Sequence, residues 1–263
     1  MNRNWLSIVL LATVSGSVRA EPFFFSTGNP DGKMAAASRP SGTALEIEAA
    51  DDFDLPLQTT IDIASFTGLV PSGTTASNLS QIVIEIYRVF PLDSTNPPSG
   101  TVPTRVNSPS DVAFASRDLA GHELTVTFEE LNAGFATNNS VLNGIHPVPN
   151  QTTGGEGPVF GEEGAFVVTF ATPVVLPAGH YFFVPQIQLS SGNFYWLSAP
   201  KPIVSPGTPL AVDLQAWIRN AGLAPNWLRI GTDIVGGAPA PTYNFTFSIS
   251  GEDDRIFADG FGG

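Results

Sequence analysis

The chain has 263 residues and a formal net charge of −13, with 24 acidic and 11 basic side chains, and it contains no cysteine. A negative field of this strength repels phosphate backbones and anionic lipid surfaces, so we expect no nucleic-acid partner. Without cysteine the chain has no disulfides and no cysteine-ligated zinc, which leaves divalent cations and neutral glycans open as partners.

The first 20 residues have the features of a secretory signal peptide. Arg3 gives a positive start, residues 5–14 form an apolar run, and residues 18–20 form a small-residue cleavage site. The apolar run has about 10 residues, whereas a membrane-spanning helix needs roughly 20. We expect cleavage before Glu21 and export of a bacterial protein to the extracellular space, the cell surface or the periplasm. A retained membrane anchor is the alternative.

After cleavage the mature chain has 243 residues and a net charge of −15, because two arginines leave with the signal peptide. Strand patterns fill most of this chain. Apolar and polar residues alternate in residues 122–130 and 242–250, which is typical of half-buried strands. Residues 81–90 and 164–176 are apolar on both faces, as central strands are. Further strands are predicted near residues 46–50, 60–67, 111–116 and 226–231.

The segment "GHYFFVPQIQLSSGNFYWLS" (179–198) contains two apolar runs on either side of Ser191-Gly192-Asn193. Glycine and asparagine at such a position favour a reversal of the chain. Two strand-like runs joined by a short turn are typical of a β-hairpin. We therefore predict that these two strands pair with each other.

One segment departs from the strand pattern. Thr208 can cap a helix that has Pro209 in its first position, and Gly222 can end it. Apolar residues recur between them at helical spacing, so a short helix is predicted over residues 209–221. Its apolar face consists of Leu210, Leu214, Trp217, Ile218 and Ala221.

Many strands, frequent turns and one short helix predict an all-β fold, a β-sandwich of jelly-roll type. The 26 glycines and 23 prolines supply the turns and break long helices. No internal repeat or linker divides the chain, so we expect one monomeric domain over residues 21–251 and a short acidic tail over residues 252–263. Two long irregular loops, residues 96–111 and 143–164, form either a binding surface or surface ornament.

The sequence resembles a recurrent type of secreted bacterial β-sandwich module. In that module an "ADDF" strand opens the domain, and an "LPAG-x-Y" turn leads into a late strand that ends near a tryptophan. This chain has "AADDFDLP", "PVVLPAGHYFFVPQI" and "FYWLS" in that order. Other stretches, among them "EIYRVFPLDS", "NQTTGGEGPV" and "WLRIGTDIVGGAPAPT", are similar to an uncharacterised family of exported bacterial proteins that often carry a PEP-CTERM sorting tail. The resemblance implies an exported β-sandwich and supplies no catalytic or binding residues.

The C-terminus departs from that family. The ending "GEDDRIFADGFGG" has no Pro-Glu-Pro motif, no apolar helix and no basic end. It resembles a short terminal tag of the type "IF-x-x-GF" found on exported gammaproteobacterial proteins. The alternative is a frayed acidic terminus.

The familiar catalytic motifs do not occur in the sequence. There is no Gly-Lys-Ser/Thr phosphate loop and no G-x-S-x-G nucleophile elbow, and Val126 stands where a zinc-protease motif begun at His122 needs its second histidine. A glycosidase needs two carboxyl groups about 5–9.5 Å apart, and no pair among the acids is distinguished. The chain is therefore predicted not to be an enzyme.

Carbohydrate binding is the sharper alternative, because sugar rings stack on exposed aromatic side chains and β-sandwiches can present them. The opposite interpretation is that these rings pack in the core, with Trp217 fixing the helix and Trp196 closing the hairpin. The candidate ligand-binding residues are Tyr195, Trp196, Trp217 and Trp227.

The stretch "EIEAADDFDLP" (46–56) holds five carboxylates in eleven positions. Alternation places Glu46 and Glu48 on the solvent side of a strand. The other three acids flank Phe53, which we expect in the core. Calcium takes 6–8 oxygen ligands, so these three are the candidate metal ligands, although the spacing of an EF-hand loop is missing. They are Asp51, Asp52 and Asp54.

Together these patterns predict a non-enzymatic protein with a binding or surface-structural role in the cell envelope or an extracellular matrix. The first alternative is a carbohydrate-binding module, with or without supporting calcium. The second is a hydrolase of extracellular polysaccharide. We expect no cofactor, and calcium is the alternative.

Overall fold

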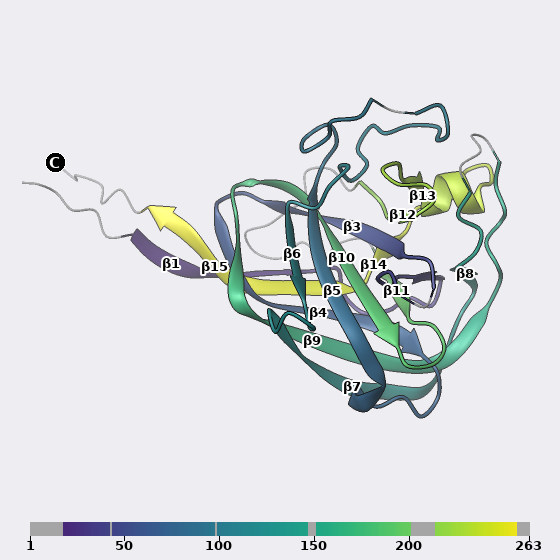
Figure 1. Ribbon diagram of the computed structural model, residues 1–263, viewed down its shortest axis with the longest axis horizontal. Helices are drawn as coiled ribbons and strands as arrows, with labels where there is room; N and C mark the ends of the chain where they lie inside the picture. The colour runs from purple at the N-terminus through teal and green to yellow at the C-terminus, as the bar shows by residue number, and fades with distance from the viewer. Residues whose placement is uncertain (1–17, 43, 98, 147–150, 201–213, 257–263) are drawn as a thin grey trace, which may run out of the picture.

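The computed structural model describes residues 18–42, 44–97, 99–146, 151–200 and 214–256. These residues form two packed β-sheets, which confirms the all-β sandwich (Figure 1). Their helical structure consists of a 3-10 turn at Ala76–Asn78 and a π-helical turn at Ile230–Val235. No helix in these ranges is long and apolar enough to cross a membrane.

The larger sheet has nine strands and contains both ends of the described chain. They are β1 (Val18–Ser26), β2 (Met34–Ala37), β4 (Thr59–Val70), β7 (Leu124–Thr137), β8 (Asn139–Val141), β9 (Val159–Leu176), β11 (Tyr195–Ala199), β14 (Asn244–Phe245) and β15 (Phe247–Ile256). Their order is β1-β15-β4-β11-β2-β8, while β9 also pairs with β4, β7 pairs with β9, and β14 pairs with β11. Every pair is antiparallel except β2–β8.

The smaller sheet has six strands in the order β13-β12-β3-β10-β5-β6, all antiparallel. They are β3 (Ile47–Leu55), β5 (Leu79–Arg88), β6 (Ala115–Asp118), β10 (Gly179–Leu189), β12 (Trp217–Asn220) and β13 (Leu228–Arg229).

The main core lies between the two sheets, because alternation turns every second side chain inward. Phe183 of the smaller sheet stacks on Phe247 of the larger one, with ring centroids 5.1 Å apart. Phe66 and Phe166 stack in the same layer at 5.3 Å. Each fully buried ring contributes roughly 1.5–3 kcal/mol. Within the alternating segments 122–130 and 242–250, the apolar residues Leu124 and Phe247 are buried, as half-buried strands require.

The predicted hairpin over residues 179–198 is wrong, although both of its strands exist. β10 belongs to the smaller sheet and β11 to the larger one, so the turn carries the chain from one sheet to the other. Both edges of β10 are occupied by β3 and β5, which leaves β11 no edge to pair with. Phe194 then enters the core, where its ring lies edge-on to Phe66 and Phe166.

The predicted helix over residues 209–221 is also wrong wherever the structure describes it; residues 209–213 lie outside the described residues. Trp217–Asn220 is strand β12, which pairs with β3. Ile218 points into the main core, and Trp217 points into a second apolar cluster on the opposite face of the sheet. A strand buried on both faces imitates the apolar spacing of a helix, which is why the local pattern misled.

Two predicted strands are shorter than expected. The strand predicted near residues 111–116 is β6 at residues 115–118, and the strand predicted near residues 226–231 is β13 at residues 228–229. The terminal strands extend beyond the predicted domain, residues 21–251. β1 begins at Val18, inside the predicted signal peptide, and β15 continues to Ile256, inside the predicted acidic tail, and the two pair along their length.

Candidate functional site

The aspartates of β3 do not converge on one point. Asp51 faces the space between the sheets, where its Oδ2 accepts a hydrogen bond of 2.7 Å from the Phe245 N–H. Asp52 points to the opposite face of the sheet. Its Oδ1 accepts a hydrogen bond of 3.1 Å from the Leu214 N–H, and its Oδ2 lies 2.6 Å from His180 Nε2. Adjacent residues on a strand point to opposite faces, so Asp52 and Asp54 share one face of β3 and Asp51 lies on the other, and the three carboxylates cannot meet at one cation. Among the described residues no group of three histidine, aspartate or glutamate side chains is placed to hold a metal.

The prediction that Glu48 lies on the solvent side of its strand is wrong, because its side chain is only 3% exposed. Arg219, directly opposite on β12, donates hydrogen bonds to both carboxylate oxygens of Glu48, and the Tyr87 hydroxyl donates to Oε1 at 2.7 Å. Glu46 is half-buried and accepts a bond from Gln186. The alternation was correctly read, but this outer face of the smaller sheet is covered. The apolar cluster that is buried on this face comprises Ala50, Tyr87, Phe182, Val184, Leu214, Trp217 and Trp227.

Glu85 completes this ionic cluster. Burial, together with the negative charge of Glu48, raises the pKa of Glu85 to about 7. The Tyr87 hydroxyl lies within hydrogen-bonding distance of both carboxylates, 2.7 Å from Glu48 Oε1 and 3.1 Å from Glu85 Oε2, and Glu48 is also held by Arg219. Glycoside hydrolysis needs two carboxyl groups about 5–9.5 Å apart with a sugar between them. Glu85 therefore has the raised pKa of a catalytic acid, but the space beside its carboxylate neighbour is filled by the side chains of Tyr87 and Arg219.

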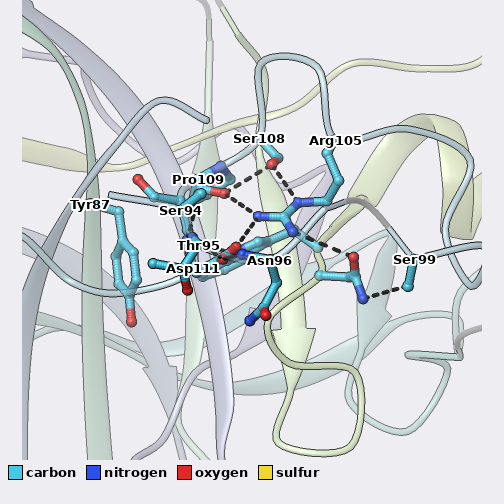
Figure 2. A network of polar contacts seen from close by, with 12 residues as sticks. Tyr87, Ser94, Thr95, Asn96, Ser99, Arg105, Ser108, Pro109 and Asp111 are labelled. Carbon is cyan, nitrogen blue, oxygen red and sulfur yellow. Dashed lines mark hydrogen bonds and ion pairs between the residues drawn. The ribbon is translucent and has the colours of Figure 1, made fainter. Parts of the chain in front are cut away.

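A second buried ion pair closes the loop that covers this face (Figure 2). Arg105 Nη2 lies 2.8 Å from Asp111 Oδ1, and Asp111 Oδ2 accepts the N–H groups of Thr95 and Asn96, each at 3.1 Å. Burial alone would raise the pKa of Asp111, but the bonds from Arg105, Asn96 and Thr95 outweigh it and hold that pKa below its usual value. The loop predicted at residues 96–111 is therefore held in place by these contacts, over the outer face of the smaller sheet.

The tryptophans do not form a sugar-binding platform. Trp196, Trp217 and Trp227 are each at most 1% exposed. Each indole N–H donates to a backbone carbonyl, those of Thr246, Leu214 and Ser110 respectively. The alternative prediction that these rings pack in the core is therefore the correct one for the three tryptophans, although neither a helix nor a hairpin is involved.

Tyr195 is the exception among the four candidates, because it is half-buried and lines a cleft. It lies opposite Leu69 of β4, on the outer face of the larger sheet. Phe160, at the start of β9, stands at the same cleft with 69% of its surface exposed. The cleft has a volume of about 200 Å³. Its lining consists of Leu69, Val70, Pro71, Val159, Phe160, Asn193 and Tyr195.

Polar groups at the cleft are held in place. Arg39 Nη1 donates to Asn193 Oδ1 at 2.8 Å, which orients the amide and keeps its NH₂ group away from Arg39. Burial, with a contribution from the charge of Glu156, raises the pKa of Tyr195, so its phenol stays protonated at neutral pH. The site thus offers two aromatic rings, an amide and a hydroxyl. Phe160 was missed in the sequence because nothing in its local pattern distinguishes an exposed phenylalanine from a core one.

The predicted loops at 96–111 and 143–164 meet at another cleft, of about 290 Å³, to which they contribute Pro103 and Thr152. Arg229 and Asp233 line it too. Their side chains bind each other through two bonds of 3.0 and 2.7 Å, which close the π-helical turn. No aromatic side chain lines this cleft among the described residues, and its charged pair is occupied in holding the turn.

No family model, no curated protein and no solved structure matches the chain.

Proposed function

We propose that the protein is an exported, non-enzymatic binding module that takes a neutral glycan in the cleft of Phe160 and Tyr195. The observation that carries the proposal is the exposed ring of Phe160 at the mouth of a cleft that also contains a half-buried tyrosine. A large ring left in water forgoes roughly 1.5–3 kcal/mol of burial. A ligand that covers the ring recovers this energy.

The chemistry of the cleft suits a sugar better than an apolar ligand. The C–H face of a sugar ring packs on an aromatic face, and its hydroxyl groups need donors and acceptors at the edge. The Asn193 amide and the Tyr195 hydroxyl lie at the cleft to supply them. The net charge of −13 and the negative charge of Glu156 near Tyr195 favour a neutral ligand over an anionic one.

A hydrolytic role is less well supported. Glu85, which has the raised pKa of a catalytic acid, lies on the other sheet from the cleft, and its neighbouring carboxylate, Glu48, is bound by Arg219 and Tyr87. Retention of a glycan in the cell envelope or an extracellular matrix is therefore the role that we propose.

Calorimetric titration of the purified protein with neutral oligosaccharides, such as cello-, xylo- and chito-oligomers, tests the proposal. We expect binding by at least one series and a matching rise in the melting temperature. Phe160→Ala should weaken this binding about tenfold, equivalent to about 1.4 kcal/mol. Val175→Ala, an exposed apolar residue at the other end of β9, is the matched control and should bind normally.

Two results would count against the proposal. One is that no neutral oligosaccharide binds. The other is that Phe160→Ala binds as tightly as the unaltered protein, which would place the ligand elsewhere. Adding calcium or a chelator to the same melts is expected to leave the midpoint unchanged, because the β3 aspartates do not converge.

A further inference from the structure

Resting on the proposed function, we infer that the site continues from the cleft along β4 as an open groove, which binds a linear, neutral polysaccharide over several consecutive sugar units. The inference depends on which aromatic side chains are exposed to solvent. Among the described residues only two aromatic side chains are exposed, Phe160 and Phe24, with 69% and 51% of their surfaces in solvent. Both line depressions of the larger sheet.

The strand β4 connects the two depressions. On the outer face of β4, Ile63 is exposed, and Ser65 and Thr67 line the groove; Leu69 follows on the same face and lines the cleft, where it is only 2% exposed. From Ile63 to Leu69 the strand advances about 20 Å, at about 3.3 Å per residue. This length accommodates a chain of several sugars, where the cleft alone holds one or two.

The groove is rich in hydroxyl groups. It has a volume of about 240 Å³ and lies beside Phe24, where β1 and β15 meet β4. Ser65 and Ser248 face each other across the strands with their hydroxyl oxygens 2.6 Å apart. The side chains of its wall that can exchange hydrogen bonds with sugar hydroxyls are Ser26, Asn29, Ser65, Thr67 and Ser248; Thr246 also lines it, but its buried hydroxyl binds the backbone of Thr67.

The surface around the groove is uncharged, although the protein is strongly acidic. Strand pairing sets ten outward side chains in two parallel rows across β1, β15, β4, β9 and β7, and none of the ten is charged. The first row is Phe24, Ser250, Ile63, Thr169 and Thr125; the second is Ser26, Ser248, Ser65, Val167 and Thr127.

Acidic side chains border these rows on both sides of β4. Glu252 of β15 is exposed and lies two residues beyond Ser250, while Glu163 of β9 pairs in register with Leu69 and Glu129 of β7 lies two residues beyond Thr127. Carboxylates at the borders of the groove repel an anionic polymer. A hydroxyl-lined surface with isolated apolar residues is also unlike the apolar centre of a protein interface. These features together select a neutral, hydroxyl-bearing chain as the occupant.

The dependence of affinity on oligosaccharide length tests the inference. Titration of the purified protein with one neutral series, from the dimer to the hexamer, should show affinity rising about tenfold between the shortest and longest members. Ser65→Tyr, which fills the groove with a side chain that strands accept, should abolish this rise and leave dimer binding intact. Ser116→Tyr, at an exposed position on β6 of the smaller sheet, is the control and should keep the rise.

Phe24→Ala provides the same test without touching a packed position, because this side chain is half exposed, and it too should remove the gain from length. The outcomes separate the two proposals. Equal affinity for dimer and hexamer, or an undiminished rise in both groove variants, overturns the groove while the cleft stands. Hexamer binding that depends on Ser65 and Phe24 but survives Phe160→Ala supports the groove and overturns the cleft. No binding by any member overturns both.

Discussion

The outer faces of the two sheets have opposite characters. The outer face of the smaller sheet carries Glu48, Arg219 and Tyr87, yet it is sealed under loops and a second apolar cluster. Across β1, β15, β4, β9 and β7 the central rows of the outer face of the larger sheet are open and uncharged, whereas at β2 and β11 this face carries a small buried apolar cluster. The conspicuous charged chemistry of this protein is therefore used to hold its fold. The surface available to a ligand is built from hydroxyl groups and two exposed phenylalanines.

The same substitution on each outer face gives the largest expected contrast. Val184 on β10 is fully buried and lies opposite Glu85, whereas Val167 on β9 is exposed. Val184→Asp buries a carboxylate beside two others, so we expect a loss of more than about 4 kcal/mol of unfolding free energy. Val167→Asp should lose about 1 kcal/mol or less. Urea unfolding followed by tryptophan fluorescence measures both. Similar losses would mean that the two faces are not different in burial.

Removal of one partner from the buried ion pair should have the next largest effect. Arg219→Met leaves the Glu48 carboxylate buried without its guanidinium, and we expect a loss of about 3–5 kcal/mol. Arg117→Met is the matched control, since Arg117 makes only exposed contacts with backbone carbonyls, and should change stability by about 0.5 kcal/mol or less. If both variants lose the same amount, Arg219 is not structurally special.

The pKa of Glu85 gives a pH-dependent contrast within the covered face. The folded-state pKa is raised from the ordinary glutamate value of 4.5 to about 7, so the folded protein holds this proton more tightly than the unfolded chain does. The stabilisation is complete below about pH 4.5 and is lost as the pH rises through about 7. The loss is on the order of 3 kcal/mol.

Glu85→Gln is the test, because a neutral amide cannot ionise. Unfolding free energies of the variant and the unaltered protein should agree near pH 4.5 and diverge by pH 8, where the variant is the more stable. Other titrating groups act in both proteins, so they cancel in the difference. A difference that is independent of pH would show that Glu85 does not titrate in this range.

Sequence alone determined the features that depend on near neighbours. Alternation placed strands at 122–130 and 242–250, and composition predicted an all-β fold. These signals are local because each strand exposes its own pattern of apolar and polar residues, whatever its partner. The burial of Phe53 was predictable for the same reason.

Only the tertiary structure decided the features that depend on what covers a residue. Glu48 alternates like a solvent-facing residue, but it binds Arg219, which is 171 positions later in the sequence and lies on the neighbouring strand. The turn at residues 191–193 leads to another sheet because both edges of β10 are taken. Trp196 and Phe160 are both aromatic residues of strand segments, yet one is buried and the other exposed. Coverage is a property of distant segments that pack together, so the candidate cleft and groove became visible only in the folded chain.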